Sequence, residues 1–272
     1  MPAAAQAWGG LGHRTVAMIA EHRLSPKARE QVQRLLGPGT SLADIAACAD
    51  DIKRRGERCG PITLQAAPRS KAWHYIDIPI QASPTAAMLT RYCRSHGRSD
   101  QCCSEQVRED LATLKDPAAS LRDKQVALMY VVHFVGDLHQ PLHNVDDADH
   151  GGNSKLLWFF KTKRTHKKTN LHHIWDNLLM KDSQVRKMPP ERLAAELERR
   201  VTTSQAQAWT QGDVISEAAL ESFEIAKTRI YPAYDPNAAL GKRYQDEMQP
   251  VALEQVAKAG VRLAYLLDGC WR

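Results

Sequence analysis

Two segments of the chain place a histidine four residues before an aspartate inside an apolar, helix-like stretch. In the first segment, His133 lies within the otherwise apolar run 131–135, and Asp137 follows two residues after the run. This spacing brings both side chains to one face of a helix, where they can reach one ion together. A carboxylate buried there needs a cation, a hydrogen-bond network or a metal. A satisfied core pair explains one such segment equally well, but a second pair, His172 and Asp176, favours a helical fold that binds metal.

Apolar residues recur at helical spacing through most of the chain. Ser25-Pro26 is typical of a helix start, with serine as the cap and proline at the first position. Helices are expected over 15–23, 26–36, 42–55, 119–138, 171–180, 191–209, 216–230 and 250–267. Lys155–Lys161 is expected to form a strand of a short hairpin. With 272 residues and no repeat or long linker, the chain is predicted to be one compact all-α domain with a small β-hairpin.

Six cysteines favour disulfides in an oxidising compartment, whereas six reduced thiols would indicate a cytosolic protein. Short loops would be closed by pairing Cys48 with Cys59, and Cys93 with either Cys102 or Cys103. Cys270 would take the remaining partner. Fifteen connectivities are open to six cysteines, so these pairings are hypotheses.

The segment Ala5-Gln6-Ala7 looks like a small-x-small signal-peptidase site. Residues 1–7 are therefore interpreted as the stub of a signal peptide, with a plain disordered tail as the alternative. Cleavage after Ala7 would leave Trp8 as the first residue of a secreted or periplasmic protein. The new α-amino group, the Trp8 carbonyl and the nearby His13 could then bind a metal together.

Two further segments add candidate ligands. Asp50 lies on an otherwise small, apolar helix face in A-A-C-A-D-D-I-K, and His74 lies in the aromatic run W-H-Y-I-D. Either residue could be an ordinary core residue, because a lone histidine among aromatic side chains is more often part of the core. His139 and His173 point away from the faces of the two paired segments.

Together these motifs resemble the S1/P1 nuclease family. The resemblance is carried, in chain order, by W-G-x-x-G-H, A-D-x-I-K, W-H-Y-I-D, H-F-V-G-D-x-x-Q-P-L-H, G-G-N and N-L-H-x-x-W-D, and by the later W-T-Q-G-D-V-I-S. It runs from Trp8 to near the C-terminus, which makes residues 8–272 the expected catalytic domain. It departs from the family at Cys48, where many members carry tryptophan.

The resemblance implies an α-helical fold that holds three zinc ions (Zn²⁺) in a cleft. Imidazole and carboxylate ligands suit zinc, and incomplete protein shells leave room for substrate. By motif position, the expected ligands are Asp50, His74, His133 and Asp137 for one ion; the Trp8 amine and carbonyl, His13 and the shared Asp137 for the second; and His143, His172 and Asp176 for the third.

The resemblance also implies metal-assisted hydrolysis of single-stranded DNA and RNA to 5′-phosphorylated products, with 3′-nucleotidase activity on nucleotides. Lys53 and Asn153 match phosphate-site positions, although a solvated lysine and a plain turn would explain them too. Tyr75 and Asp77 match the base pocket, where Tyr75 would stack on a base. Asp77 would accept a hydrogen bond from the base edge, or it would orient His74.

The net charge of +6 and the isoelectric point of about 9.0 favour a polyanionic partner, such as nucleic acid or anionic lipid. The basic run Lys161–Lys168 would extend the nucleic-acid track, or it would be a solvated hairpin tip. A monomer is expected. No run of about 18 apolar residues occurs, so no membrane span is expected. The alternatives are a zinc-dependent phospholipase C and a non-catalytic, secreted zinc-binding protein.

Overall fold

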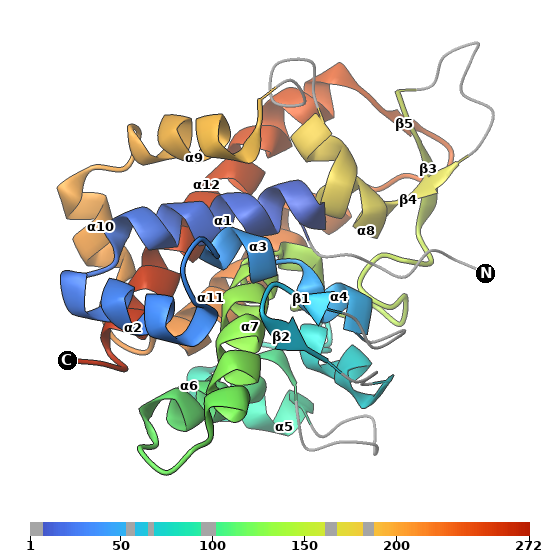
Figure 1. Ribbon diagram of the computed structural model, residues 1–272. Helices are drawn as coiled ribbons and strands as arrows, with labels where there is room; N and C mark the ends of the chain where they lie inside the picture. Colours follow the sequence, from blue (N-terminus) through green and yellow to red (C-terminus); the bar gives the residue numbers. More distant parts are fainter. Residues whose placement is uncertain (1–7, 53–57, 65–67, 94–101, 161–167, 182–187) are drawn as a thin grey trace.

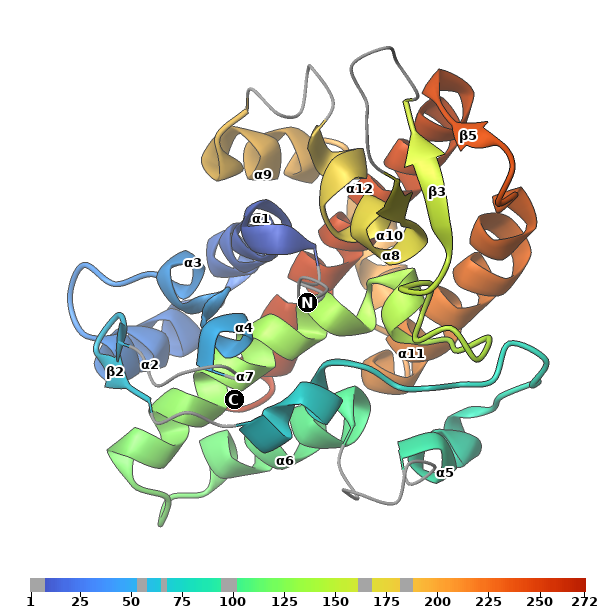
Figure 2. The ribbon, with the colours of Figure 1, turned by 90° about the vertical axis from the view of Figure 1, so that its right-hand side faces the viewer.

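A long, buried helix, α7, lies at the centre of the structure (Figures 1 and 2). The structure is a computed structural model, and it describes residues 8–52, 58–64, 68–93, 102–160, 168–181 and 188–272. In these ranges the α-helices are α1 (Gly9–Arg23), α2 (Pro26–Leu36), α3 (Leu42–Ile45), α4 (Cys48–Ile52), α5 (Leu89–Cys93), α6 (Cys103–Lys115), α7 (Leu121–Leu138), α8 (Leu171–His173), α9 (Pro190–Glu198), α10 (Thr203–Trp209), α11 (Val214–Ile225) and α12 (Lys242–Asp268).

Short helical turns and strands complete the described fold. The 3-10 turns are η1 (Pro68–His74), η2 (Ala86–Met88), η3 (Pro141–His143), η5 (Leu179–Lys181) and η7 (Tyr231–Ala233), and the π-helical turns are η4 (Ile174–Leu178) and η6 (Ala226–Ile230). The strands are β1 (Arg58–Cys59), β2 (Ile62–Thr63), β3 (Leu156–Phe159), β4 (Thr169–Asn170) and β5 (Ala239–Leu240). The predicted all-α fold class with a small hairpin is confirmed.

Helix α7 is stable because its sequence supplies both its ends and a core on every side. The Ser120 side chain accepts a hydrogen bond from the Asp123 amide at 3.1 Å and so caps the first turn. The helix ends before Gln140-Pro141, because a proline disfavours helical backbone in the residue before it. Every residue from Ala127 to Leu138 is buried against α1, α6, α11 and α12. His133 and Asp137 therefore lie in the core, away from bulk water.

The expected helix over 42–55 is wrong in one respect, because α3 and α4 are separated at Ala46-Ala47. The break has a physical reason in the structure. The Ala46 carbonyl accepts a hydrogen bond from His133 Nδ1 at 2.8 Å, so it is not used within a continuous helix. Residues 53–55, including Lys53, lie outside the described residues.

The C-terminal third differs from the sequence prediction at two helix boundaries. The expected helix 191–209 is two helices, because a capping box between Thr202 and Gln205 starts α10 anew. Helix α12 begins at Lys242, well before the expected start at Pro250. Tyr244 and Met248 are buried on the turns before the proline, and this packing holds Pro250 inside the helix.

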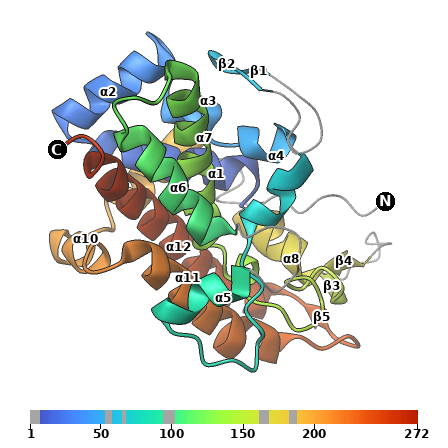
Figure 3. The ribbon, with the colours of Figure 1, turned by 90° about the horizontal axis from the view of Figure 1, so that it is seen from below.

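Strands β3, β4 and β5 form a three-stranded sheet that lies at one end of the molecule beside α8 (Figures 1 and 3). The C-terminus lies at the opposite end near α2 (Figures 1 and 3). Strand β3 pairs antiparallel with β4, with Leu157 opposite Thr169, and parallel with β5, with Trp158 opposite Ala239. The sequence predicted only a hairpin, and β5 is a third strand beside it. No helix among the described residues is both long and apolar enough to cross a membrane.

Two disulfides link Cys48 to Cys59 and Cys93 to Cys102, which confirms two of the three predicted pairings. The third pairing is wrong, because Cys103 and Cys270 are both free. The Cys103 thiol lies inside the core and donates to the Phe134 carbonyl at 3.3 Å. Burial raises its pKa well above the usual value, so this thiol stays protonated.

The disulfide between Cys48 and Cys59 ties α4, which carries Asp50, to β1. Replacing both cysteines by serine is expected to lower the free energy of unfolding by about 2–3 kcal/mol, because the unfolded chain gains loop entropy. Urea unfolding under oxidising conditions measures the change. The control is Cys270→Ser, which removes a free thiol and is expected to change the stability by less than about 1 kcal/mol. Equal effects of the two changes would contradict this role of the disulfide.

Candidate metal centre

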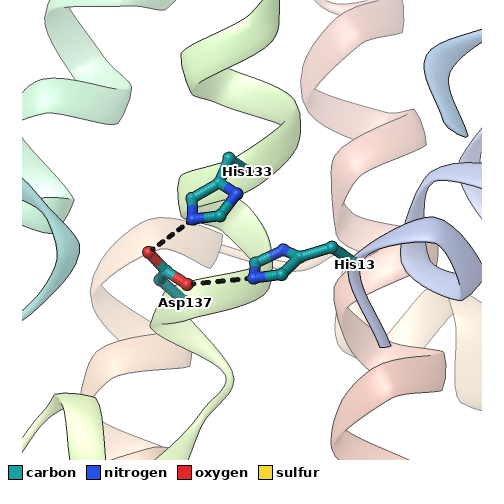
Figure 4. A group of neighbouring side chains, drawn as sticks. All are labelled: His13, His133 and Asp137. Atoms are coloured by element: carbon teal, nitrogen blue, oxygen red, sulfur yellow. Dashed lines mark ion pairs between the residues drawn. The ribbon is translucent and has the colours of Figure 1, made fainter. Parts of the chain in front are cut away.

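The first side-chain cluster surrounds the Asp137 carboxylate, which is fully buried near the end of α7. His13 on α1 approaches one oxygen, with 3.4 Å between Nε2 and Oδ1 (Figure 4). His133, one turn earlier on α7, and His74, at the end of η1, approach the other oxygen at 3.4 and 2.9 Å. The two oxygens of Asp137 thus face two different sets of imidazoles.

Asp50 on α4 completes this cluster on the side of His74 and His133. Its Oδ1 lies 3.9 Å from His74 Nδ1 and 3.8 Å from His133 Nε2, and the residue is 3% exposed. The hydrogen bond from His133 Nδ1 to the Ala46 carbonyl fixes the tautomer of the ring. Because a carbonyl can only accept, Nδ1 carries the proton and Nε2 turns its lone pair toward the two carboxylates.

The second cluster contains His143, His172 and Asp176, all buried. His172 Nε2 lies 3.3 Å from Asp176 Oδ2 and 3.2 Å from His143 Nε2. His172 Nδ1 donates to the Gly151 carbonyl at 2.7 Å, which leaves Nε2 as the acceptor. Burial lowers the pKa of His172, but the negative charge of Asp176 and the other interactions of the ring together outweigh this effect and raise it. Gln140 was not among the sequence candidates, yet its amide donates to Asp176 Oδ1 at 2.6 Å.

His143 connects the two clusters. Its Nδ1 donates to the His74 carbonyl at 2.7 Å and lies 3.9 Å from Asp137 Oδ1, while its Nε2 faces His172. Because α7 ends at Leu138 and Pro141 starts η3, His143 leaves the face of His133. The proline therefore determines which cluster His143 joins.

The histidines carry different charges because they differ in their neighbours. Burial and the charge of His13 lower the pKa of His133 to about 3, and burial lowers the pKa of His143 to about 4. Burial also lowers the pKa of His13, but its interactions with Asp137 and the charges of Asp50 and Asp176 together outweigh burial and raise it. Although burial alone would raise the pKa of Asp137, the histidines hold it well below its usual value. His133 and His143 are therefore neutral near pH 7, which is the form that binds metal.

Several polar atoms in both clusters have no hydrogen-bond partner in the described part of the chain. These buried atoms are Nδ1 and Nε2 of His13, Nε2 of His74, Oδ1 of Asp137 and Oδ2 of Asp176. Each unsatisfied buried group costs about 1–3 kcal/mol. A tetrahedral ion at about 2.0–2.2 Å keeps its ligand atoms roughly 3.3–3.6 Å apart. The separations of 3.4 Å from Asp137 to His13 and His133, and of 3.3 Å from Asp176 to His172, lie in this range, so these donors could hold metal ions.

Trp8 anchors the start of α1 to the first cluster. It is buried, and its indole nitrogen donates to the Gly136 carbonyl at 2.9 Å, one residue before Asp137. Its backbone is left-handed (φ 36°), and its carbonyl accepts a hydrogen bond from the Gly12 amide at 3.1 Å. A Cβ at position 12 would lie 2.4 Å from that of Trp8, so only glycine fits there. The α-amino role of Trp8 stays a prediction, because residues 1–7 lie outside the described ranges.

Three of the candidate substrate residues, Tyr75, Asp77 and Asn153, lie within the described part of the chain. Tyr75 directly follows His74 and is 38% exposed, while Asp77 is half-buried. Partial burial and the charges of Asp77 and Asp146 raise the pKa of Tyr75. Asn153 is half-buried and donates to the His150 carbonyl at 2.8 Å. Lys53 and residues 161–167 of the basic run lie outside the described residues.

His139, expected from the sequence to point away from the face of His133, is buried. It accepts a hydrogen bond from Arg262 on α12 at 3.0 Å, and its Nδ1 donates to the Val135 carbonyl at 2.7 Å. Burial and the Arg262 charge lower its pKa to about 3, so the ring is neutral. It therefore links α7 to α12 without joining the metal clusters.

Comparison with known proteins finds relatives over almost the whole chain. A family model described as S1/P1 Nuclease matches residues 8–272. Nuclease S1 of Aspergillus oryzae (strain ATCC 42149 / RIB 40) is 30% identical over 279 residues, covering 96% of this chain and 91% of the relative. Nuclease P1 of Penicillium citrinum is 30% identical over 278 residues, covering 94% and 95%. Endonuclease 4 of Arabidopsis thaliana is 28% identical over 285 residues, covering 96% and 88%.

The position of His13 depends on the absence of a side chain at Gly136. An alanine Cβ there would lie 2.8 Å from His13 Nδ1 and 3.0 Å from Cε1. Gly136→Ala is expected to lower the free energy of unfolding by about 1–3 kcal/mol through overpacking. This loss would appear despite a helix-propensity gain of up to about 1 kcal/mol. Urea unfolding measures the change.

The matched control is Gly10→Ala, because a Cβ at Gly10 meets no atom within 4 Å. It is expected to leave the stability unchanged or to raise it slightly. If both substitutions stabilise the protein equally, the wedging of His13 against Gly136 is refuted.

Proposed function

This chain belongs to the S1/P1 nuclease family, and on that premise we propose that it is a zinc-dependent nuclease acting on single-stranded DNA and RNA. Its products would carry 5′-phosphates, and it would also remove the phosphate of 3′-nucleotides. The observation that carries the proposal is the pair of buried histidine–aspartate clusters with unpartnered ligand atoms. Among the described residues, these clusters offer nitrogen and oxygen donors of the kind that suit zinc.

The proposed ligands fall into three sets. Asp50, His74, His133 and Asp137 would hold one ion; Trp8, His13 and Asp137 the second; and His143, His172 and Asp176 the third. The two oxygens of Asp137 face different imidazoles, at 3.4 Å for His13 and 2.9 Å for His74, and this supports a carboxylate shared between two ions. When bound, zinc supplies Lewis acidity and lowers the pKa of water toward neutrality.

The chain's own residues would orient the substrate. Tyr75 is exposed beside His74, where its ring can stack on an unpaired base. Asp77 would accept a hydrogen bond from the base edge, and Lys53 and Asn153 would contact the phosphate. A duplex keeps its bases stacked and paired, so an aromatic platform at this place favours single strands.

The proposed location is outside the cytosol. Two disulfides within the chain support an oxidising compartment. Secretion with cleavage after Ala7 would also free the amine of Trp8 for the second ion. We further propose that the protein acts as a monomer.

The test is hydrolysis by protein that starts at Trp8, with and without a chelator and with zinc restored. Substrates are single-stranded DNA and RNA, the matching duplexes, a 3′-nucleotide and phosphatidylcholine vesicles. Release of 5′-mononucleotides from single strands is expected, with loss of at least about 100-fold on chelation and recovery with zinc, because the clusters lose their charge compensation.

Three outcomes would count against the proposal. Cleavage of phosphatidylcholine alone would indicate a phospholipase. No turnover at full zinc occupancy would indicate a non-catalytic zinc protein. Activity that persists in metal-free protein would exclude zinc dependence.

A further inference from the structure

We propose that Asp149 and Tyr231, supported by Lys155, are positioning residues that fix the orientation of His172. They do so by holding the loop 145–155, whose Gly151 carbonyl bonds the His172 ring. The inference rests on the proposed function, in which His172 is a zinc ligand.

Asp149 is a buried carboxylate that accepts the Asp147 amide at Oδ1, at 3.2 Å, and is held further by two side chains. It is 3% exposed, and both of its oxygens accept the Tyr231 hydroxyl, at 2.9 and 3.0 Å. Lys155 Nζ lies 3.9 Å from Asp149 Oδ2 and 3.0 Å from Asp147 Oδ2. A buried charge needs such partners, so the Tyr231 hydroxyl is costly to remove.

Lys155 is itself held by aromatic rings. Its Nζ lies 5.7 Å from the centroid of the Tyr231 ring and 5.4 Å from that of Tyr234. Tyr231 belongs to η7, which follows α11 through η6, so these contacts tie the loop to a distant part of the chain.

The loop adopts a strained backbone that its hydrogen bonds maintain. Asp146 Oδ1 accepts the amides of Asp149 and His150 at 3.1 and 2.9 Å, and the Asp149 carbonyl accepts the Ser154 amide at 3.0 Å. His150, Gly151 and the following glycine all have positive φ, at 57°, 60° and 83°. A non-glycine residue persists in this region only when its surroundings determine it.

The loop holds His172 through two hydrogen bonds. The Gly151 carbonyl accepts the His172 Nδ1 proton at 2.7 Å, and the Gly152 carbonyl accepts the His172 amide at 3.4 Å. A Cβ at Gly151 would lie 2.3 Å from the Leu142 carbonyl, so the backbone of the loop packs closely against η3, which carries His143. A shift of Gly151 would therefore release the tautomer and the ring orientation that direct Nε2 at Asp176.

The test is Tyr231→Phe, which keeps the ring over Lys155 and deletes only the hydroxyl bonded to Asp149. Zinc affinity is measured by competition with a chelator, and the His172 Nδ1 proton is observed by NMR in metal-free protein. About 10-fold weaker binding of one zinc ion is expected, because outer partners of a ligand histidine tune its affinity. The Nδ1 proton signal should broaden or disappear, since its carbonyl acceptor is no longer fixed.

The matched control is Tyr234→Phe, which also keeps a ring near Lys155 but removes a hydroxyl that does not bond Asp149 in the structure. Parental zinc affinity and an unchanged His172 signal are expected for it. Asp149→Asn is the second variant, because the amide keeps the shape and can still accept from Tyr231. It should show the same changes to a smaller extent.

Circular dichroism establishes that each variant is folded. Parental zinc affinity and an unchanged His172 Nδ1 signal in folded Tyr231→Phe and Asp149→Asn would overturn the inference. If the parent binds zinc but cleaves no nucleic acid, the proposed function fails while this inference stands on its two readouts. If the parent binds no zinc, the NMR signal alone decides it.

Discussion

The buried charge of Asp137 is the constraint on which the rest of the structure depends. Its carboxylate lies in the core, where an isolated ion would be too costly to keep. Imidazoles from three separate elements, α1, η1 and α7, converge on it. Helix α7 must therefore stay in register with α1 and η1, because a shift of either would leave the carboxylate uncompensated.

Backbone carbonyls orient three of the histidines in the two clusters. The Ala46 carbonyl holds His133, the His74 carbonyl holds His143, and the Gly151 carbonyl holds His172. A carbonyl accepts only, so each contact determines which ring nitrogen faces the centre. This explains why short, irregular segments surround the site, because a regular helix would use these carbonyls within itself.

The sequence predicted the parts of the molecule that local chemistry determines. The spacing of His133 and Asp137 indicated a shared face, and Ser25-Pro26 indicated the start of α2, where the Ser25 side chain caps the helix. The motif order indicated the family, which the match over 8–272 confirms. Asp50 and His74 were candidates from motif order, and the structure brings both beside His133.

The parts that sequence reasoning missed depend on tertiary contacts. Nothing local marks Ala46-Ala47 as a helix break, because the reason is a bond to His133 far along the chain. Pro250 was predicted to start a helix that in fact begins at Lys242, because the packing of the turns before the proline is not visible in the sequence. Gln140 was visible within the Gln-Pro motif, but its bond to Asp176 appears only once α8 and η4 fold against η3.

The unpartnered atoms around Asp137 and Asp176 are the proposed metal ligands, and the proposed function depends on them. The most direct measurement is anomalous diffraction at the zinc absorption edge, on crystals of protein that starts at Trp8 and is equilibrated with zinc. Three peaks are expected, each about 2.0–2.2 Å from the proposed ligand atoms, two of them sharing Asp137. No peak at saturating zinc, with His13 and His74 still bonded directly to Asp137, would contradict this assignment.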